Sequence, residues 1–117
     1  MREGLHVLQE LARPSPRDTL LVTDLRAGNV LRCGSEQWII IDPKPFVGDP
    51  SYDLVQHLIN CEGRLYDSPL TLVERLADLA EVDAERLRLW TFARAAADPR
   101  EDWDNKPWFE IARKLAV

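Results

Sequence analysis

Apolar residues recur at helical spacing along most of the chain. Residues 3–12 place Leu5, Leu8 and Leu11 near one helical face, and Pro14 ends this segment. The same spacing predicts four later helices, at residues 52–60, 68–80, 83–97 and 107–116. The segment 83–97 has the widest apolar arc, which is typical of a deeply packed helix. The pattern therefore predicts a mainly helical α+β fold.

Short apolar segments in the first half of the chain predict strands. Residues 20–22 form one, and residues 30–32 and 37–41 form a β-hairpin around a Gly-Ser-Glu turn. The second arm ends in a purely apolar run, so we expect it to be buried. Residues 43–51 contain three prolines and one glycine, which predicts an ordered but irregular loop.

Three polar side chains lie at the ends of these strands. Asp24 follows the first strand, Asn29 precedes the hairpin and Asp42 follows it. Each alone is typical of a turn or a loop cap. However, phosphoryl-transfer sites use the same order of carboxylate, amide and carboxylate. There, one acid aligns and deprotonates the attacking hydroxyl, while the amide and the second acid hold the metal that bridges the phosphates. The hairpin brings Asn29 and Asp42 together, so the set predicts a phosphoryl-transfer site with Asp24 as the catalytic residue.

Further charged residues follow Asp42. Lys44 is expected either to reach a phosphate, to pair with Asp42 or Asp49, or to remain solvated. Asp53 begins a helix, where negative charge is favourable, and we expect it to accept backbone amides of the catalytic loop. Asp49 is expected to support the Pro-rich loop in the same way. His57 lies one helical turn after Asp53, but we favour a packed, hydrogen-bonded histidine over a metal ligand.

Composition and charge limit the classes of function. The 117 residues predict one small domain, 1–117, and the net charge of -5 without a basic block argues against a nucleic-acid partner. Since such a surface does not attract nucleotides at long range, a phosphate site must depend on local metal and dipoles. The apolar run 38–41 is too short to span a membrane. Cys33 and Cys61 lack a metal-binding spacing, and with no signal peptide at Met1 they predict free thiols in the cytoplasm.

Several segments resemble the aminoglycoside/hydroxyurea phosphotransferases, the family that includes streptomycin kinases. The segments are TDLRAGNVL at 23–31, IDPKPFVGDPSYD at 41–53, QHLINC at 56–61 and LWTFAR at 89–94. The resemblance implies the C-terminal lobe of a protein-kinase-like fold, with ATP and Mg²⁺ as cofactors and a small-molecule hydroxyl as acceptor. It also implies Asp24 as catalytic base, Asn29 and Asp42 as metal ligands and Asp53 as support for the loop.

The chain departs from the family pattern in three respects. Arg26 stands where the family usually has histidine, and Val22-Thr23 precedes the catalytic Asp24 where much of the wider fold has His-Gly. The 117 residues also contain no Gly-rich loop, no strand lysine with a partnering acid and no hinge, so the nucleotide-binding lobe is missing from them. We therefore expect a catalytic lobe present as a fragment or truncated form.

Two other functions remain open at this point. A non-catalytic remnant would act as an interaction module, and the surface uncovered by the missing lobe would favour self-association. A metal hydrolase would use Asp24, Asp42 and Asp49, although the chain has no His-rich or paired-acid motif. For the acceptor, the acidic residues within 101–104 would suit a cationic sugar, but a solvated charge run is the preferred interpretation.

Overall fold

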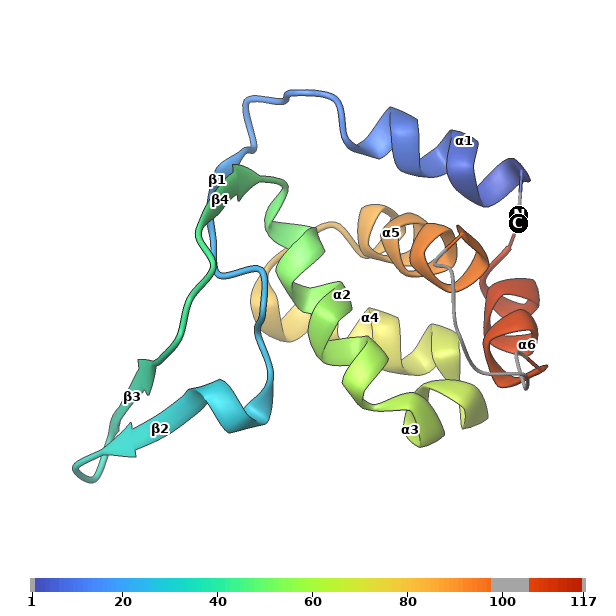
Figure 1. Cartoon of the computed structure of the whole chain (residues 1–117). Coiled ribbons are helices and arrows are strands. Elements are labelled where there is room, and N and C mark those ends of the chain that lie inside the picture. The colour runs from blue at the N-terminus through green and yellow to red at the C-terminus, as the bar shows by residue number, and fades with distance from the viewer. Residues whose placement is uncertain (1, 98–105, 117) are drawn as a thin grey trace.

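Helices make up most of the structure, and a β-rich segment connects the first helix to the others (Figure 1). The computed structural model describes residues 2–97 and 106–116. In chain order its elements are α1 (Arg2–Leu11), β1 (Thr19–Leu21), the 3-10 turn η1 (Ala27–Asn29), β2 (Val30–Cys33), β3 (Gln37–Ile40), β4 (Phe46–Gly48), α2 (Pro50–Asn60), α3 (Glu62–Asp67), α4 (Pro69–Ala80), α5 (Ala84–Ala97) and α6 (Lys106–Leu115). This arrangement confirms the predicted mainly helical α+β class. None of the described helices is both long and apolar enough to cross a membrane.

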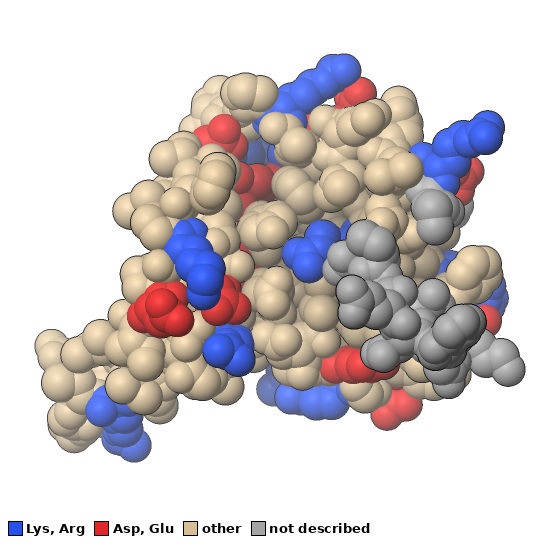
Figure 2. Space-filling model, viewed as in Figure 1, with Lys and Arg blue, Asp and Glu red and all other residues tan. Residues whose placement is uncertain are grey.

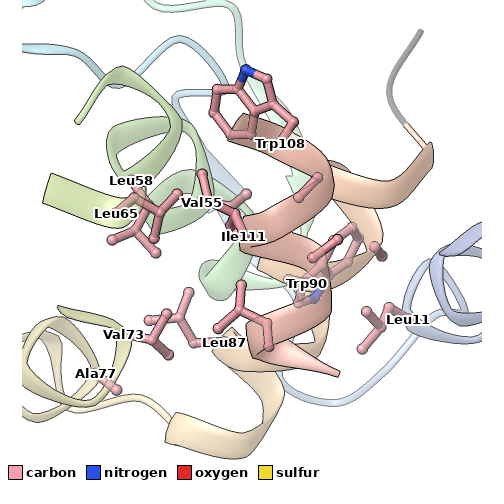
Figure 3. Close-up of a cluster of buried hydrophobic side chains, with 14 residues drawn as sticks. Leu11, Val55, Leu58, Leu65, Val73, Ala77, Leu87, Trp90, Trp108 and Ile111 are labelled. Atoms are coloured by element: carbon pink, nitrogen blue, oxygen red, sulfur yellow. The ribbon is translucent and has the colours of Figure 1, made fainter. Parts of the chain in front are cut away.

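The core is built around α5, which packs against α1, α2, α4 and α6. Leu87, Trp90 and Ala93 of α5 are buried in one cluster with Val55 of α2 and Ile111 of α6 (Figure 3). Because apolar side chains cover α5 on several sides, it loses most of its exposed surface to its neighbours. The deep packing predicted for this helix is confirmed.

The buried face of α1 includes Leu8 and Leu11, as predicted, but not Leu5. Gly4 and Leu11 are buried, whereas Leu5 is 46% exposed. A Cβ atom added to Gly4 would lie 2.7 Å from the Cβ of Ala96, so the missing side chain allows α1 to approach α5 closely. The apolar pattern missed Gly4 because it counts side chains and cannot register a contact made by a glycine.

Two small antiparallel sheets form the β-rich segment. β2 pairs with β3 from Val30–Ile40 to Cys33–Gln37, which confirms the predicted hairpin. β1 pairs with β4, from Thr19–Gly48 to Leu21–Phe46. The prediction of an irregular loop at 43–51 was wrong at β4, because its prolines lie outside the three paired residues and remove none of their amides.

The apolar hairpin is exposed, which contradicts the burial predicted for its second arm. Trp38 is 65% exposed and Ile40 45% exposed, and every residue of β3 is accessible. The hairpin projects away from the helices, so none of the described elements covers it (Figure 1). An apolar run indicates that a segment favours burial, but it does not identify the surface that would bury the segment.

Smaller differences concern the helices. α2 begins at Pro50, two residues earlier than predicted, and Gly63 lies inside α3, which the sequence analysis missed. Leu79 belongs to the apolar pattern that predicts the helix at 68–80, but it is 73% exposed on α4. The acidic residues within 101–104 lie outside the described residues.

Candidate active site

Two loops meet at the root of the hairpin. The amide of Lys44 donates to the carbonyl of Val22 at 2.9 Å, and the amide of Ile41 donates to the carbonyl of Asn29 at 2.8 Å. These bonds hold residues 22–29 beside residues 41–44. Three residues that are separate in the sequence, Asp24, Asn29 and Asp42, are therefore carried by adjoining segments.

The Asp24 carboxylate is surrounded by donors. The Asn29 amide nitrogen donates to Asp24 Oδ2 at 3.2 Å and to the Asp24 backbone oxygen at 3.0 Å. Lys44 Nζ donates to the same Oδ2 at 3.1 Å, and Arg26 Nε lies 3.8 Å from Oδ1. The Asp24 side chain is 25% exposed, so a small molecule can reach it from one side.

These neighbours favour the ionised form of Asp24. The hydrogen bond from Lys44 lowers the pKa of the Asp24 carboxyl. Partial desolvation opposes this effect, while the charges of Lys44 and Arg26 and the amide of Asn29 lower the pKa further. Asp24 is therefore an anion at neutral pH, ready to accept a proton or a cation.

The backbone on both sides of the site is strained. Thr23 has φ of 62° and Asp42 has φ of 51°, a region that side chains other than glycine adopt rarely. The Thr23 hydroxyl donates to the backbone oxygen of Lys44, which ties the two strained loops together. Backbone strain of this kind clusters at functional sites, because surrounding contacts must maintain it.

Asp53 holds the loop that carries Asp24. Its two carboxylate oxygens accept the backbone amides of Val22 and Thr23, each at 2.8 Å. Hydrogen bonds to a charged acceptor are about twice as strong as neutral ones. The first turn of α2 therefore fixes the position of the strained residue that precedes Asp24.

Asp49 has a different surrounding from the one predicted. It caps α2 by accepting the Ser51 amide at 3.0 Å, and it also accepts Trp90 Nε1 at 2.8 Å and pairs with Arg86. It thus joins α2 to α5 rather than supporting the Pro-rich loop. Lys44 pairs with Asp24 and Asp42, not with Asp49. The sequence analysis missed Arg86 and Trp90 as polar partners, because their spacing marked only a helix.

The site offers oxygen ligands for one divalent cation. The side-chain nitrogen of Asn29 donates to Asp24, so the side-chain oxygen of Asn29 remains available as a ligand atom. Asp42 contributes a carboxylate that is 71% exposed. Mg²⁺ accepts such a set, with water and phosphate filling the other positions. In the described ranges, no three or more His, Cys, Asp or Glu side chains are grouped so that they could hold a metal ion, and His57 therefore belongs to no such group.

A cavity of about 490 Å³ lies beside the site. Thr23, Phe46, Tyr52 and Trp90 are among its mainly apolar walls, but Asp24 is not. Its size is within the range of small-molecule pockets. A molecule bound there would contact the strained loop beside Asp24 rather than the carboxylate itself.

Known proteins share sequence similarity with this chain. Residues 3–101 match the sequence model of a family described as aminoglycoside/hydroxyurea antibiotic resistance kinase. The chain is 38% identical over 94 residues to a hydroxyurea phosphotransferase of Kitasatospora aureofaciens, and the aligned region covers 80% of this chain and 27% of that protein. It is 36% identical over 85 residues to a streptomycin 6-kinase of Streptomyces griseus, which covers 68% of this chain and 28% of that protein.

The extent of these matches limits what they show. The chain spans little more than a quarter of the length of the two relatives. The chain is also 36% identical over 88 residues to a streptomycin 6-kinase of Streptomyces glaucescens, and the aligned region covers 28% of that protein. No solved structure gives a significant match. The comparisons therefore establish a family relationship at the level of sequence.

Proposed function

Because the chain belongs to the aminoglycoside/hydroxyurea antibiotic resistance kinase family, we propose that it forms the C-terminal, catalytic lobe of an ATP-dependent phosphotransferase. The acceptor is a hydroxyl group on a small molecule of the antibiotic type. The observation that carries this proposal is the cluster of Asp24, Asn29, Lys44 and Asp42 on two loops joined at the root of the hairpin. The lobe is of the protein-kinase type and consists of a single domain.

In the proposed mechanism, Asp24 would align the acceptor hydroxyl and take its proton as the hydroxyl oxygen bonds to the terminal phosphorus of ATP, while the bond from that phosphorus to the bridging oxygen breaks and ADP leaves. Asn29 and Asp42 would hold Mg²⁺ with their oxygen atoms, and Lys44 would face the phosphate side. A metal ion held there would supply positive charge that stabilises the negative charge developing on the transferred phosphoryl group. Asp53 supports the reaction by holding the two amides before Asp24, while Asp49 supports it from a greater distance by joining α2 to α5.

The proposed activity also requires a nucleotide-binding lobe. The 117 residues contain neither a Gly-rich loop nor a strand lysine with a partnering acid, and they span little more than a quarter of the relatives. We propose that this chain supplies the catalytic half of the site. A cytoplasmic location, where ATP is available, is consistent with the free thiols Cys33 and Cys61.

Calorimetric titration of the chain with Mg²⁺ and ATP tests the proposal. We expect binding by the natural chain and at least a tenfold loss in Asp42→Ala, since even outer-shell metal partners contribute tenfold or more to affinity. Asp78→Ala is the matched control, because Asp78 is an exposed acid on α4. Equal binding by Asp42→Ala and the natural chain would refute the metal site. No binding by any of the three would refute a working half-site in this chain.

The exposed hairpin supports a second candidate function, a non-catalytic module that associates with a second copy. Both faces of the hairpin are apolar, with Leu31 and Ile39 on one and Trp38 and Ile40 on the other. The outer edge of β3 is unpaired in the described structure, and a two-stranded hairpin is marginal by itself. Pairing of two β3 edges would cover apolar surface and satisfy free backbone groups together.

Sedimentation velocity at micromolar concentration distinguishes this association from a monomer. We expect a concentration-dependent dimer for the natural chain and a monomer for the double variant Trp38→Ser, Ile40→Thr, because the variant removes apolar contacts at the interface. Leu79→Ser, which removes a 73% exposed leucine from α4, should leave the dimer intact. A natural chain that remains monomeric at a concentration of about 50 μM would eliminate the second function.

A further inference from the structure

Lys44 places its ammonium group at the centre of the candidate site. Nζ lies 3.1 Å from Asp24 Oδ2 and 3.8 Å from Asp42 Oδ2. The Asn29 amide nitrogen is bound to that same Asp24 oxygen at 3.2 Å. The ammonium therefore lies among the three side chains that the sequence predicts for catalysis and metal binding. Figure 2 shows basic and acidic side chains gathered where the hairpin leaves the helical body.

The backbone of Lys44 is fixed although its side chain is exposed. Its amide donates to Val22 and its carbonyl accepts the Thr23 hydroxyl, so both peptide groups are tied to the loop before Asp24. The side chain itself is 62% exposed and makes no other ion pair among the described residues. It can therefore change partners without moving the loop.

A lysine ammonium and a divalent cation cannot occupy the same position. Two carboxylates on adjoining loops repel one another unless a positive charge lies between them. Lys44 supplies that charge here, and Arg26 approaches Asp24 from its other oxygen, Oδ1. A metal ion held by Asp42 and Asn29 would compete with Nζ, which lies 3.8 Å from Asp42 Oδ2, for the charge of that carboxylate.

We propose that Lys44 is an internal counter-ion, which occupies the divalent-cation position in the free site and moves to a phosphate oxygen when metal and nucleotide bind. This inference rests on the proposed function and assigns Lys44 as a positioning residue for it. In the free site the ammonium holds Asp24 and Asp42 together. In the loaded site it leaves one oxygen of Asp24 available for the acceptor hydroxyl.

The proposal predicts opposite changes in two affinities. Lys44→Met should bind Mn²⁺ without nucleotide about three- to tenfold more tightly than the natural chain, because the competing ammonium is gone. The same variant should bind Mg²⁺ with ATP more weakly by a similar factor, because a phosphate contact is lost. Lys44→Arg retains the charge and should lie close to the natural chain in both titrations.

Two further variants make the test specific. Lys114→Met makes the same change in net charge at a lysine that contacts Tyr66 on another part of the surface, and should change neither affinity. Adding Asp42→Ala to Lys44→Met should abolish the gain in Mn²⁺ affinity. Circular dichroism should show the same helix content for all variants.

The outcomes separate this inference from the proposed function. Mn²⁺ affinity that is unchanged, absent or lower in Lys44→Met overturns the counter-ion role. Tighter Mn²⁺ binding together with tighter nucleotide binding overturns the movement to phosphate. The proposed function fails on a different result, namely nucleotide binding by the natural chain that does not depend on Asp42.

Discussion

Asp24→Asn is expected to lower turnover by about 10³-fold, since a positioned general base contributes roughly 10²–10⁴-fold. Asparagine has nearly the same shape and can still accept hydrogen bonds from Asn29 and Lys44. It cannot take a proton from the acceptor hydroxyl at neutral pH. The loss should therefore appear in kcat, with the stability of the fold nearly unchanged.

The measurement requires a nucleotide-binding lobe. We suggest a chimera in which this chain replaces the matching 27% of the Kitasatospora aureofaciens hydroxyurea phosphotransferase, with phosphoryl transfer measured before and after the substitution. Asp78→Asn, on the exposed side of α4, is the control and should retain full turnover. If Asp24→Asn keeps its rate within a few-fold of the parent chimera, Asp24 is not the base.

Asp49→Ala should produce the largest loss of stability. The Asp49 carboxylate is buried and joins the Ser51 amide, the Trp90 indole and the Arg86 guanidinium. Alanine removes the cap of α2 and leaves two donors near the core without an acceptor. We expect the free energy of unfolding to fall by about 3 kcal/mol, which corresponds to a drop in Tm of roughly 10 °C for a chain of this size.

Asp83→Ala provides the matched control in urea or thermal denaturation. The Asp83 carboxylate caps α5 by accepting the Glu85 amide at 3.0 Å, but Asp83 is exposed and its carboxylate accepts no buried donor among the described contacts. Its removal should cost only the cap, about 1 kcal/mol. Equal losses in the two variants would show that the bonds from Trp90 and Arg86 contribute nothing to stability.

The pH dependence of the same pair gives a second test. Burial raises the pKa of Asp49, but hydrogen bonds from Trp90, Ser51 and Arg86 outweigh burial and lower the pKa overall. Because the pKa of Asp49 is lower in the folded state, ionised Asp49 stabilises the fold at pH values above its pKa in the unfolded chain, about 3.9. This contribution disappears as the pH falls through the pKa of the folded state. The stability difference between the natural chain and Asp49→Ala should therefore shrink below about pH 4.

Local pattern in the sequence determined most of the helices and the hairpin. The period of apolar residues placed α5 and α6 to within a residue, and the short turn between two apolar arms predicted the β2–β3 pairing. These features depend on neighbours a few positions apart, so their physical cause is contained in the sequence itself. The order of Asp24, Asn29 and Asp42 is likewise local, which is why it indicated phosphoryl transfer before any fold was known.

Contacts between distant segments were decided by the tertiary structure alone. β4 forms because β1 lies beside it, and Asp49 reaches Trp90 because α2 crosses α5. Lys44 lies between Asp24 and Asp42 because two loops are tied at Val22, a pairing that no periodicity encodes. The exposure of the hairpin has the same origin, since an apolar segment is buried only where another surface meets it, and every residue of β3 remains exposed although β3 pairs with β2.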